Sequence, residues 1–151
     1  MTLIFNSDGF PVYFEQAPTI MVRDPLAEFL GAAEHGLMTY RYVDAVRLAG
    51  HSCPTVAGAY LMVCRGLKAL YGDDVPERGG IEVRMRDGRD EGTTGVVASV
   101  ATLLTGAAAE QGFGGIGVNR RFARRDLLAF NGNIDLQAAF ERLQPEIQTA
   151  L

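Results

Sequence analysis

The sequence has few cysteines and no long apolar run, and each scarcity excludes a class of protein. Two cysteines, Cys53 and Cys64, among 151 residues do not make a disulfide framework, so we expect a reducing cytoplasm. No stretch is long and apolar enough to span a bilayer, and residues 1–6 do not resemble a signal peptide. The net charge of −4 argues against nucleic-acid binding. We therefore expect a cytoplasmic protein that binds neither membranes nor nucleic acids.

The chain is long enough and apolar enough to build one sizeable core. Residues 54–71 predict a long helix that is apolar on most sides and therefore buried, and residues 95–107 predict a second buried helix. Strict alternation over residues 81–86 predicts a strand. Residues 136–151 predict an amphipathic helix that Pro145 kinks or splits. Without repeats or linkers, the sequence predicts a single compact α+β domain over residues 1–151, with an antiparallel or mixed sheet packed against long buried helices.

Shorter elements are also predicted, mainly from glycine and proline positions. They are a hairpin over 3–14, a helix over 25–36 capped by Asp24, a strand or turn over 37–42, a helix over 43–49 and a strand over 124–130.

The stretch Gly50-His51-Ser52-Cys53-Pro54 carries the strongest chemical signal. Proline is favoured in the first turn of a helix, which places Cys53 at or just before the N-cap of the long helix. Unpaired amides and the helix dipole there stabilise a thiolate, and His51 can reach the same space. The alternative is a half-buried histidine and a buried cysteine with structural roles.

The same two side chains are candidate ligands of Zn²⁺. There is no CxxC pair for a four-ligand structural site, and a catalytic zinc site needs about three protein ligands and an open position. Oxygen ligands would then complete it, and Glu91 is the first choice, followed by Asp90 and Asp44. Glu91 and Asp90 follow the strand over 81–86, where α/β folds place ligands; a solvated charged turn is the alternative.

Other motifs bear on ligand binding. Residues 112–117 match GxGxxG, but a helix precedes them, so dinucleotide binding is not predicted. Ser52 and Ser99 lack the nucleophile-elbow setting of serine hydrolases. Two arginine pairs are predicted to clamp a small anionic ligand, with a basic surface turn as the alternative. They are Arg120, Arg121, Arg124 and Arg125.

Two motifs carry a resemblance to a known family. Residues 50–54, with Gly58 and a long apolar helix, resemble the glycine-His-x-Cys-Pro signature of the FmdE family, which is named after a component of formylmethanofuran dehydrogenase. Residues 103–106, followed by Gly112, are similar to its Leu-Thr-Gly-Cys motif and glycine-rich loop. The resemblance covers residues 44–117. It implies a compact, commonly dimeric α+β domain with a metal near His-x-Cys, and with His51 and Cys53 as metal ligands or active-site groups.

The chain also departs from the family pattern. Ala49 stands where the family has a further histidine, Ala107 where it has the cysteine of the second motif, and Thr93 or Thr94 where another cysteine is expected. There is no cysteine-rich C-terminal zinc finger. The chain therefore resembles a short, divergent member whose metal has oxygen ligands, or whose site is metal-free.

Three functional hypotheses follow. The first is a homodimeric zinc-binding domain with His51 and Cys53 as core ligands, acting as an enzyme of unassigned reaction on a small anionic substrate. The second is a non-catalytic accessory subunit of a one-carbon or molybdo/tungsto-enzyme system. The third is metal-free thiol chemistry with Cys53 as the nucleophile and His51 as its base.

Overall fold

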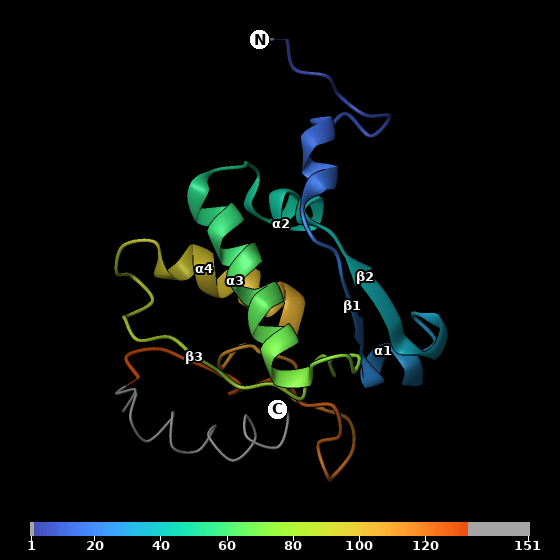
Figure 1. Ribbon diagram of the computed structural model, residues 1–151. Helices are drawn as coiled ribbons and strands as arrows, with labels where there is room; N and C mark the ends of the chain where they lie inside the picture. The colour runs from blue at the N-terminus through green and yellow to red at the C-terminus, as the bar shows by residue number, and fades with distance from the viewer. Residues whose placement is uncertain (1, 133–151) are drawn as a thin grey trace.

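Two helices form the centre of the molecule. The computed structural model describes residues 2–132, so the helix predicted over 136–151 lies outside the described residues. Helix α3 (Pro54–Tyr71) packs against α4 (Thr94–Thr105), and α2 (Tyr42–Ala49) contacts both (Figure 1). The bounds of α3 agree with the sequence prediction, because Pro54 and Gly72 mark its ends locally.

The main core lies where these three helices meet. Val56 and Tyr60 of α3 are fully buried, and Leu104 of α4 and Ala45 of α2 complete the contact. The Tyr60 hydroxyl donates a hydrogen bond to the Pro18 carbonyl oxygen at 2.6 Å, so its polar atom is satisfied within the apolar surroundings.

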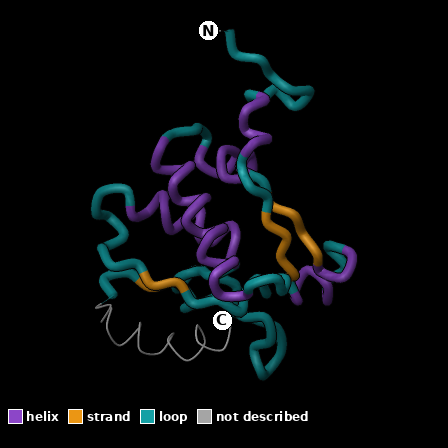
Figure 2. The backbone as a smooth tube through the Cα atoms, in the orientation of Figure 1, coloured by secondary structure: helices purple, strands orange, loops and turns teal. Residues whose placement is uncertain are grey.

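Two small pairs of strands accompany the helices, and Figure 2 shows the longer pair, β1 and β2, in orange beside the helices. Strand β1 (Ile20–Arg23) pairs antiparallel with β2 (Leu37–Tyr40), and β3 (Val83–Arg84) pairs parallel with β4 (Leu128–Ala129). This combination confirms the predicted α+β class. Strand β1 was not predicted, and β4 is much shorter than the strand predicted over 124–130.

The short N-terminal elements differ from their predictions. Asn6 organises the predicted turn, because its side-chain oxygen accepts hydrogen bonds from two amides that follow it. The second arm of the predicted hairpin is instead a 3-10 helix (Val12–Gln16). Helix α1 (Pro25–Phe29) is capped by Asp24 as predicted, but it stops early, and Gly31 then takes a left-handed φ of +69°.

Helix α3 buries one face and exposes the other. The side chains of Leu61, Met62 and Leu70 are 42%, 57% and 56% exposed. The sequence predicts a helix buried on most sides, and the difference shows that the described fold covers one side of α3. Among the helices of residues 2–132, none has the length and apolarity needed to cross a membrane.

Candidate functional site

The connection from α2 to α3 places the chemistry-bearing residues at the start of α3. Gly50 ends α2 with a left-handed φ of 80°, and its amide donates to the Val46 carbonyl oxygen at 2.8 Å. Cys53 is extended, and its carbonyl oxygen accepts the first helical hydrogen bond from the Ala57 amide at 3.0 Å. Cys53 is therefore the N-cap residue of an 18-residue helix, as the sequence predicted.

The thiol of Cys53 is partly exposed and lies at the positive end of the helix dipole. The Val56 amide is the main influence that lowers the pKa of this thiol. Partial burial raises the pKa, while His51 and the Thr55 amide lower it again. Within residues 2–132, the sulfur accepts no hydrogen bond of capping geometry.

The imidazole of His51 is held next to this thiol. Its Nδ1 lies 3.1 Å from the Ala49 carbonyl oxygen and donates a hydrogen bond to it. That carbonyl is the main reason why the pKa of His51 is raised, and the neighbouring Cys53 adds to the shift. The raised imidazole pKa and the lowered thiol pKa both favour an imidazolium–thiolate pair.

A buried tyrosine anchors the loop that carries both groups. The hydroxyl oxygen of Tyr42 lies 2.7 Å from Oγ of Ser52, and the ring of Tyr42 belongs to the main core. Ser52 is thus a positioning residue between His51 and Cys53. Sequence reasoning missed Tyr42, because it assigned this residue to the strand or turn over 37–42 and began the helix one position later, at residue 43.

The carboxylates predicted to complete a zinc site have other surroundings. Glu91 closes its own turn, because its Oε1 accepts a hydrogen bond from the Gly88 amide at 3.1 Å. Asp44 accepts one from the Arg41 amide at 2.8 Å at the start of α2, and Asp90 is exposed.

The described residues do not build a mononuclear zinc site. In residues 2–132, no three His, Cys, Asp or Glu side chains are grouped so that they could hold one metal ion. His51 and Cys53 therefore supply two donors, and Asp90 and Glu91 do not join them as a third. Zinc binding stays a prediction.

The four arginines predicted to clamp an anion also have different surroundings. Arg124 is buried and pairs with Asp24, at 2.5 Å between Nη2 and Oδ1. This corrects the prediction that Arg124 binds a ligand, because its anion is already part of the fold. The Arg121 guanidinium lies over the rings of Phe29 and Phe122, whereas Arg120 and Arg125 are exposed on the same loop.

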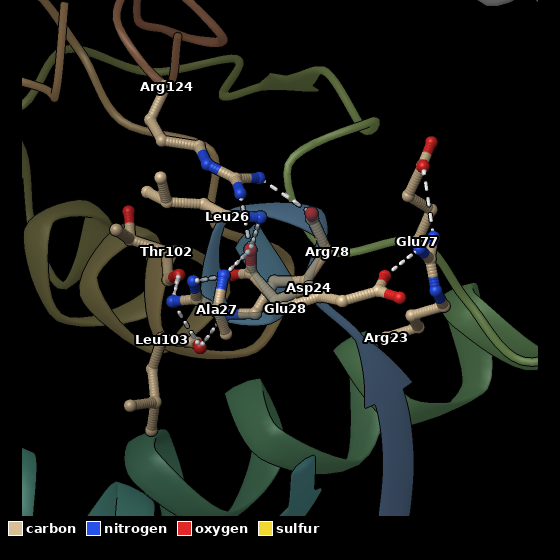
Figure 3. Close-up of polar contacts among 10 residues, drawn as sticks. All are labelled: Arg23, Asp24, Leu26, Ala27, Glu28, Glu77, Arg78, Thr102, Leu103 and Arg124. Atoms are coloured by element: carbon tan, nitrogen blue, oxygen red, sulfur yellow. Dashed lines mark hydrogen bonds and ion pairs between the residues drawn. The ribbon is translucent and has the colours of Figure 1, made fainter. Parts of the chain in front are cut away.

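Asp24, Arg78 and Arg124 form an ion-pair network in which Asp24 and Arg124 are buried and Arg78 is partly buried (Figure 3). Asp24 caps α1 through the amides of Leu26 and Ala27, and its Oδ2 accepts a hydrogen bond from Arg78 Nη1 at 2.9 Å. Burial alone would raise the pKa of Asp24. The Arg78 hydrogen bond, the charge of Arg124 and the two amides outweigh burial and lower the pKa.

The network also ties separate parts of the chain together. Arg78 donates to the carbonyl oxygens of Thr102 and Leu103 at the end of α4, and Arg124 donates to the Arg78 carbonyl oxygen at 2.6 Å. The α4 carbonyls supply partial negative charge to an arrangement that otherwise has two cations and one anion. Its role is therefore structural.

Comparisons with protein-family models, with curated proteins and with solved structures found no match to this chain. Membership of the FmdE family accordingly stays a prediction from the two sequence motifs. The residues at the start of α3 are the strongest candidate for a functional site, because they combine a partly exposed thiol with an imidazole on an anchored loop.

Proposed function

We propose that this protein carries out nucleophilic chemistry with the thiolate of Cys53, assisted by the imidazole of His51. The observation that supports the proposal is their shared position at the start of α3, with the sulfur at the N-cap and the ring fixed by the Ala49 carbonyl. Such a setting favours the thiolate, which attacks electrophilic carbon.

The pair supplies a complete addition step to a carbonyl compound. The Cys53 sulfur forms a bond to the carbonyl carbon, and the carbonyl π electrons move to the oxygen. The His51 imidazolium gives its proton to that oxygen, which yields a neutral hemithioacetal or hemithioketal and a neutral imidazole. The step needs no oxidant or further reactant, and the positive end of α3 favours an anionic group on the substrate.

Zinc binding is the second candidate function, and one contact favours it. Metal-ligating histidines commonly donate their other ring N–H to a carbonyl oxygen, as His51 does to Ala49. His51 and Cys53 would be the ligands, and bound Zn²⁺ would supply a Lewis acid. A third ligand would have to come from outside the described residues of one chain.

The remaining predictions from the sequence belong to the same proposal. A cytoplasmic location suits a free thiol because that compartment is reducing. A homodimer and a small anionic ligand are proposed as well. The accessory-subunit hypothesis differs from the proposal in that it gives the Cys53 sulfur no chemical role.

Alkylation of Cys53 tests the proposal directly. We expect the pH dependence of its reaction with iodoacetamide, followed by mass spectrometry, to give an apparent pKa below the ordinary value of about 8.5. The shift arises from the α3 amides and His51, so His51→Gln should move the apparent pKa upward. Cys64 is an internal control, because burial raises its thiol pKa and it should react slowly.

The same assay separates thiol chemistry from zinc binding. Free-thiol chemistry predicts that a chelator leaves the alkylation rate unchanged, whereas zinc on the sulfur predicts a slower reaction that chelation accelerates. Stoichiometric zinc that is lost in both His51→Gln and Cys53→Ser would select the second candidate. An ordinary thiol pKa in metal-free protein would overturn the nucleophile proposal.

A further inference from the structure

A cavity lies between the N-terminal turn at Asn6, the 3-10 helix (Val12–Gln16) and the start of α2. The 3-10 helix contacts α2, and Figure 1 shows it in blue beside that helix. The cavity has a volume of about 330 Å³, which is at the lower end of the range of about 300–1,000 Å³ found for ligand pockets. It is therefore of a size that suits a small organic molecule.

Three aromatic residues supply much of the apolar lining. They are Phe10, Phe14 and Tyr42. The Phe14 ring packs edge-on against the Tyr42 ring, with the centroids 5.0 Å apart, and the centroid of Phe10 lies 6.4 Å from that of Phe14. Tyr42 belongs to the main core, and Phe10 and Phe14 pack against that core. The rings are therefore held in place by the fold and form a preformed apolar surface.

Hydrogen bonds of Asn6 organise the acidic part of the lining. Its Oδ1 accepts from the amides of Asp8 and Phe10, both at 3.0 Å, and its Nδ2 donates to Oε1 of Glu15 at 3.2 Å. Asn6, Asp8 and Glu15 all line the cavity. A carboxylate accepts several hydrogen bonds, so Glu15 keeps acceptor capacity for a ligand.

A residue of opposite charge, Arg41, lines the same cavity. It directly precedes α2, where its amide donates a hydrogen bond to Asp44. Among residues 2–132, no ion pair joins its guanidinium to Asp8, to Glu15 or to another carboxylate. Residues of both charges therefore line one cavity without neutralising each other.

We propose that this cavity binds a free α-amino acid with an apolar side chain. The ammonium group of the ligand donates hydrogen bonds to the carboxylates of Asp8 and Glu15, and its carboxylate accepts a bidentate pair from Arg41. The apolar side chain contacts the aromatic rings. A ligand with a single charge would leave the opposite charge of the cavity without a partner, which is why the lining favours a zwitterion.

Isothermal titration calorimetry of the full chain with L-phenylalanine and L-leucine tests the proposal. We expect saturable binding of both amino acids at millimolar or lower concentration. Phenethylamine lacks the carboxylate of phenylalanine, and 3-phenylpropionate lacks its ammonium group. Each analogue should bind several-fold more weakly than phenylalanine, because one charge of the cavity then has no partner. This comparison requires no variant of the protein.

Substitutions on the protein side assign each charge. Arg41→Gln should weaken phenylalanine binding several-fold without weakening that of phenethylamine, which has no carboxylate. Arg65→Gln is the matched control, because it removes the same charge from an exposed position of α3 outside the cavity lining. It should leave the affinity unchanged. Asp8→Asn combined with Glu15→Gln should weaken phenylalanine binding without weakening that of 3-phenylpropionate.

Three results would overturn the proposal. They are the absence of saturable binding of either amino acid, equal affinities for phenylalanine and its two analogues, and equal effects of Arg41→Gln and Arg65→Gln. Cys53→Ser should leave phenylalanine binding unchanged, because neither His51 nor Cys53 lines the cavity. Loss of binding in that variant would place the ligand at Cys53 and would also contradict the proposal. The titration and the alkylation of Cys53 can therefore fail independently.

Discussion

Replacing Asp24 by alanine should lower the free energy of unfolding by about 3–5 kcal/mol, because it leaves the buried Arg124 and the partly buried Arg78 without their anion. The Asp24 side chain is 5% exposed and the Arg124 side chain 8%. The Arg124 guanidinium cannot recover the lost interaction by turning toward water without opening the fold. The substitution also removes the N-cap of α1, where Asp24 accepts hydrogen bonds from Leu26 and Ala27.

Urea unfolding at pH 7 measures this loss, and two further variants separate its causes. Asp24→Asn keeps a capping oxygen but removes the charge, so most of the loss should persist. Asp44→Ala removes a more exposed carboxylate that caps the start of α2, and it should cost about 1 kcal/mol. Equal losses for Asp24→Ala and Asp44→Ala would contradict a special role for the buried network.

The acid sensitivity of the protein should change with the same substitution. The pKa of Asp24 is lowered in the folded state, so its ionisation stabilises the fold above the unfolded-state pKa of about 3.9. That contribution to stability disappears as the pH falls through the pKa of Asp24 in the folded state. Urea unfolding of Asp24→Asn and of the unmodified protein should be measured from about pH 6 downward in steps of about one pH unit. The free energy of unfolding should fall less steeply with decreasing pH for Asp24→Asn than for the unmodified protein.

Gly79→Ala should lower the free energy of unfolding by roughly 3–5 kcal/mol, as Asp24→Ala does, because it drives Arg124 away from Asp24. An added Cβ would lie 0.8 Å from Nη1 of Arg124, and Gly79 has a φ of +92° that favours glycine. The Gly79 amide also donates to the Thr105 carbonyl oxygen at 2.7 Å, so the backbone cannot shift freely to relieve the overlap.

Gly50→Ala is the matched control for backbone conformation. Gly50 has a φ of +80°, and no atom of residues 2–132 comes within 4 Å of its Cβ position. The decrease in the free energy of unfolding of Gly50→Ala should reflect backbone strain alone and amount to about 1–2 kcal/mol. Comparing the two variants by urea unfolding isolates the displacement of Arg124. If both lose the same stability, the close approach at Gly79 has no energetic importance.

Features with local signals were predictable from the sequence. Pro54 and Gly72 mark the ends of α3 in the sequence itself, and Asp24 before Pro25 marks the cap of α1. The juxtaposition of His51 and Cys53 was predictable for the same reason, because only Ser52 separates them along the chain. In each case the interaction that decides the structure lies within a few positions.

Features that depend on distant partners were not predictable. Arg124 looked like a ligand-binding residue because its anion, Asp24, lies 100 positions earlier in the chain. Whether Glu91 lies near His51 and Cys53 likewise depends on how segments about 40 positions apart pack together, and the structure shows Oε1 of Glu91 accepting a hydrogen bond from the Gly88 amide instead. Strand β1 also escaped prediction, since it lacks strict alternation and takes its register from β2.

The sequence separation between the members of the ion-pair network also bears on how the protein folds during its synthesis on the ribosome. Asp24 is synthesised before both of its partners, because Arg78 follows 54 positions later and Arg124 follows 100 positions later. At about 5–20 residues per second, synthesis of that interval takes roughly 5–20 s. Until the first arginine emerges, the Asp24 carboxylate stays hydrated, since burying it alone would be costly. The ion-pair network can therefore close completely only after Arg124 has left the exit tunnel.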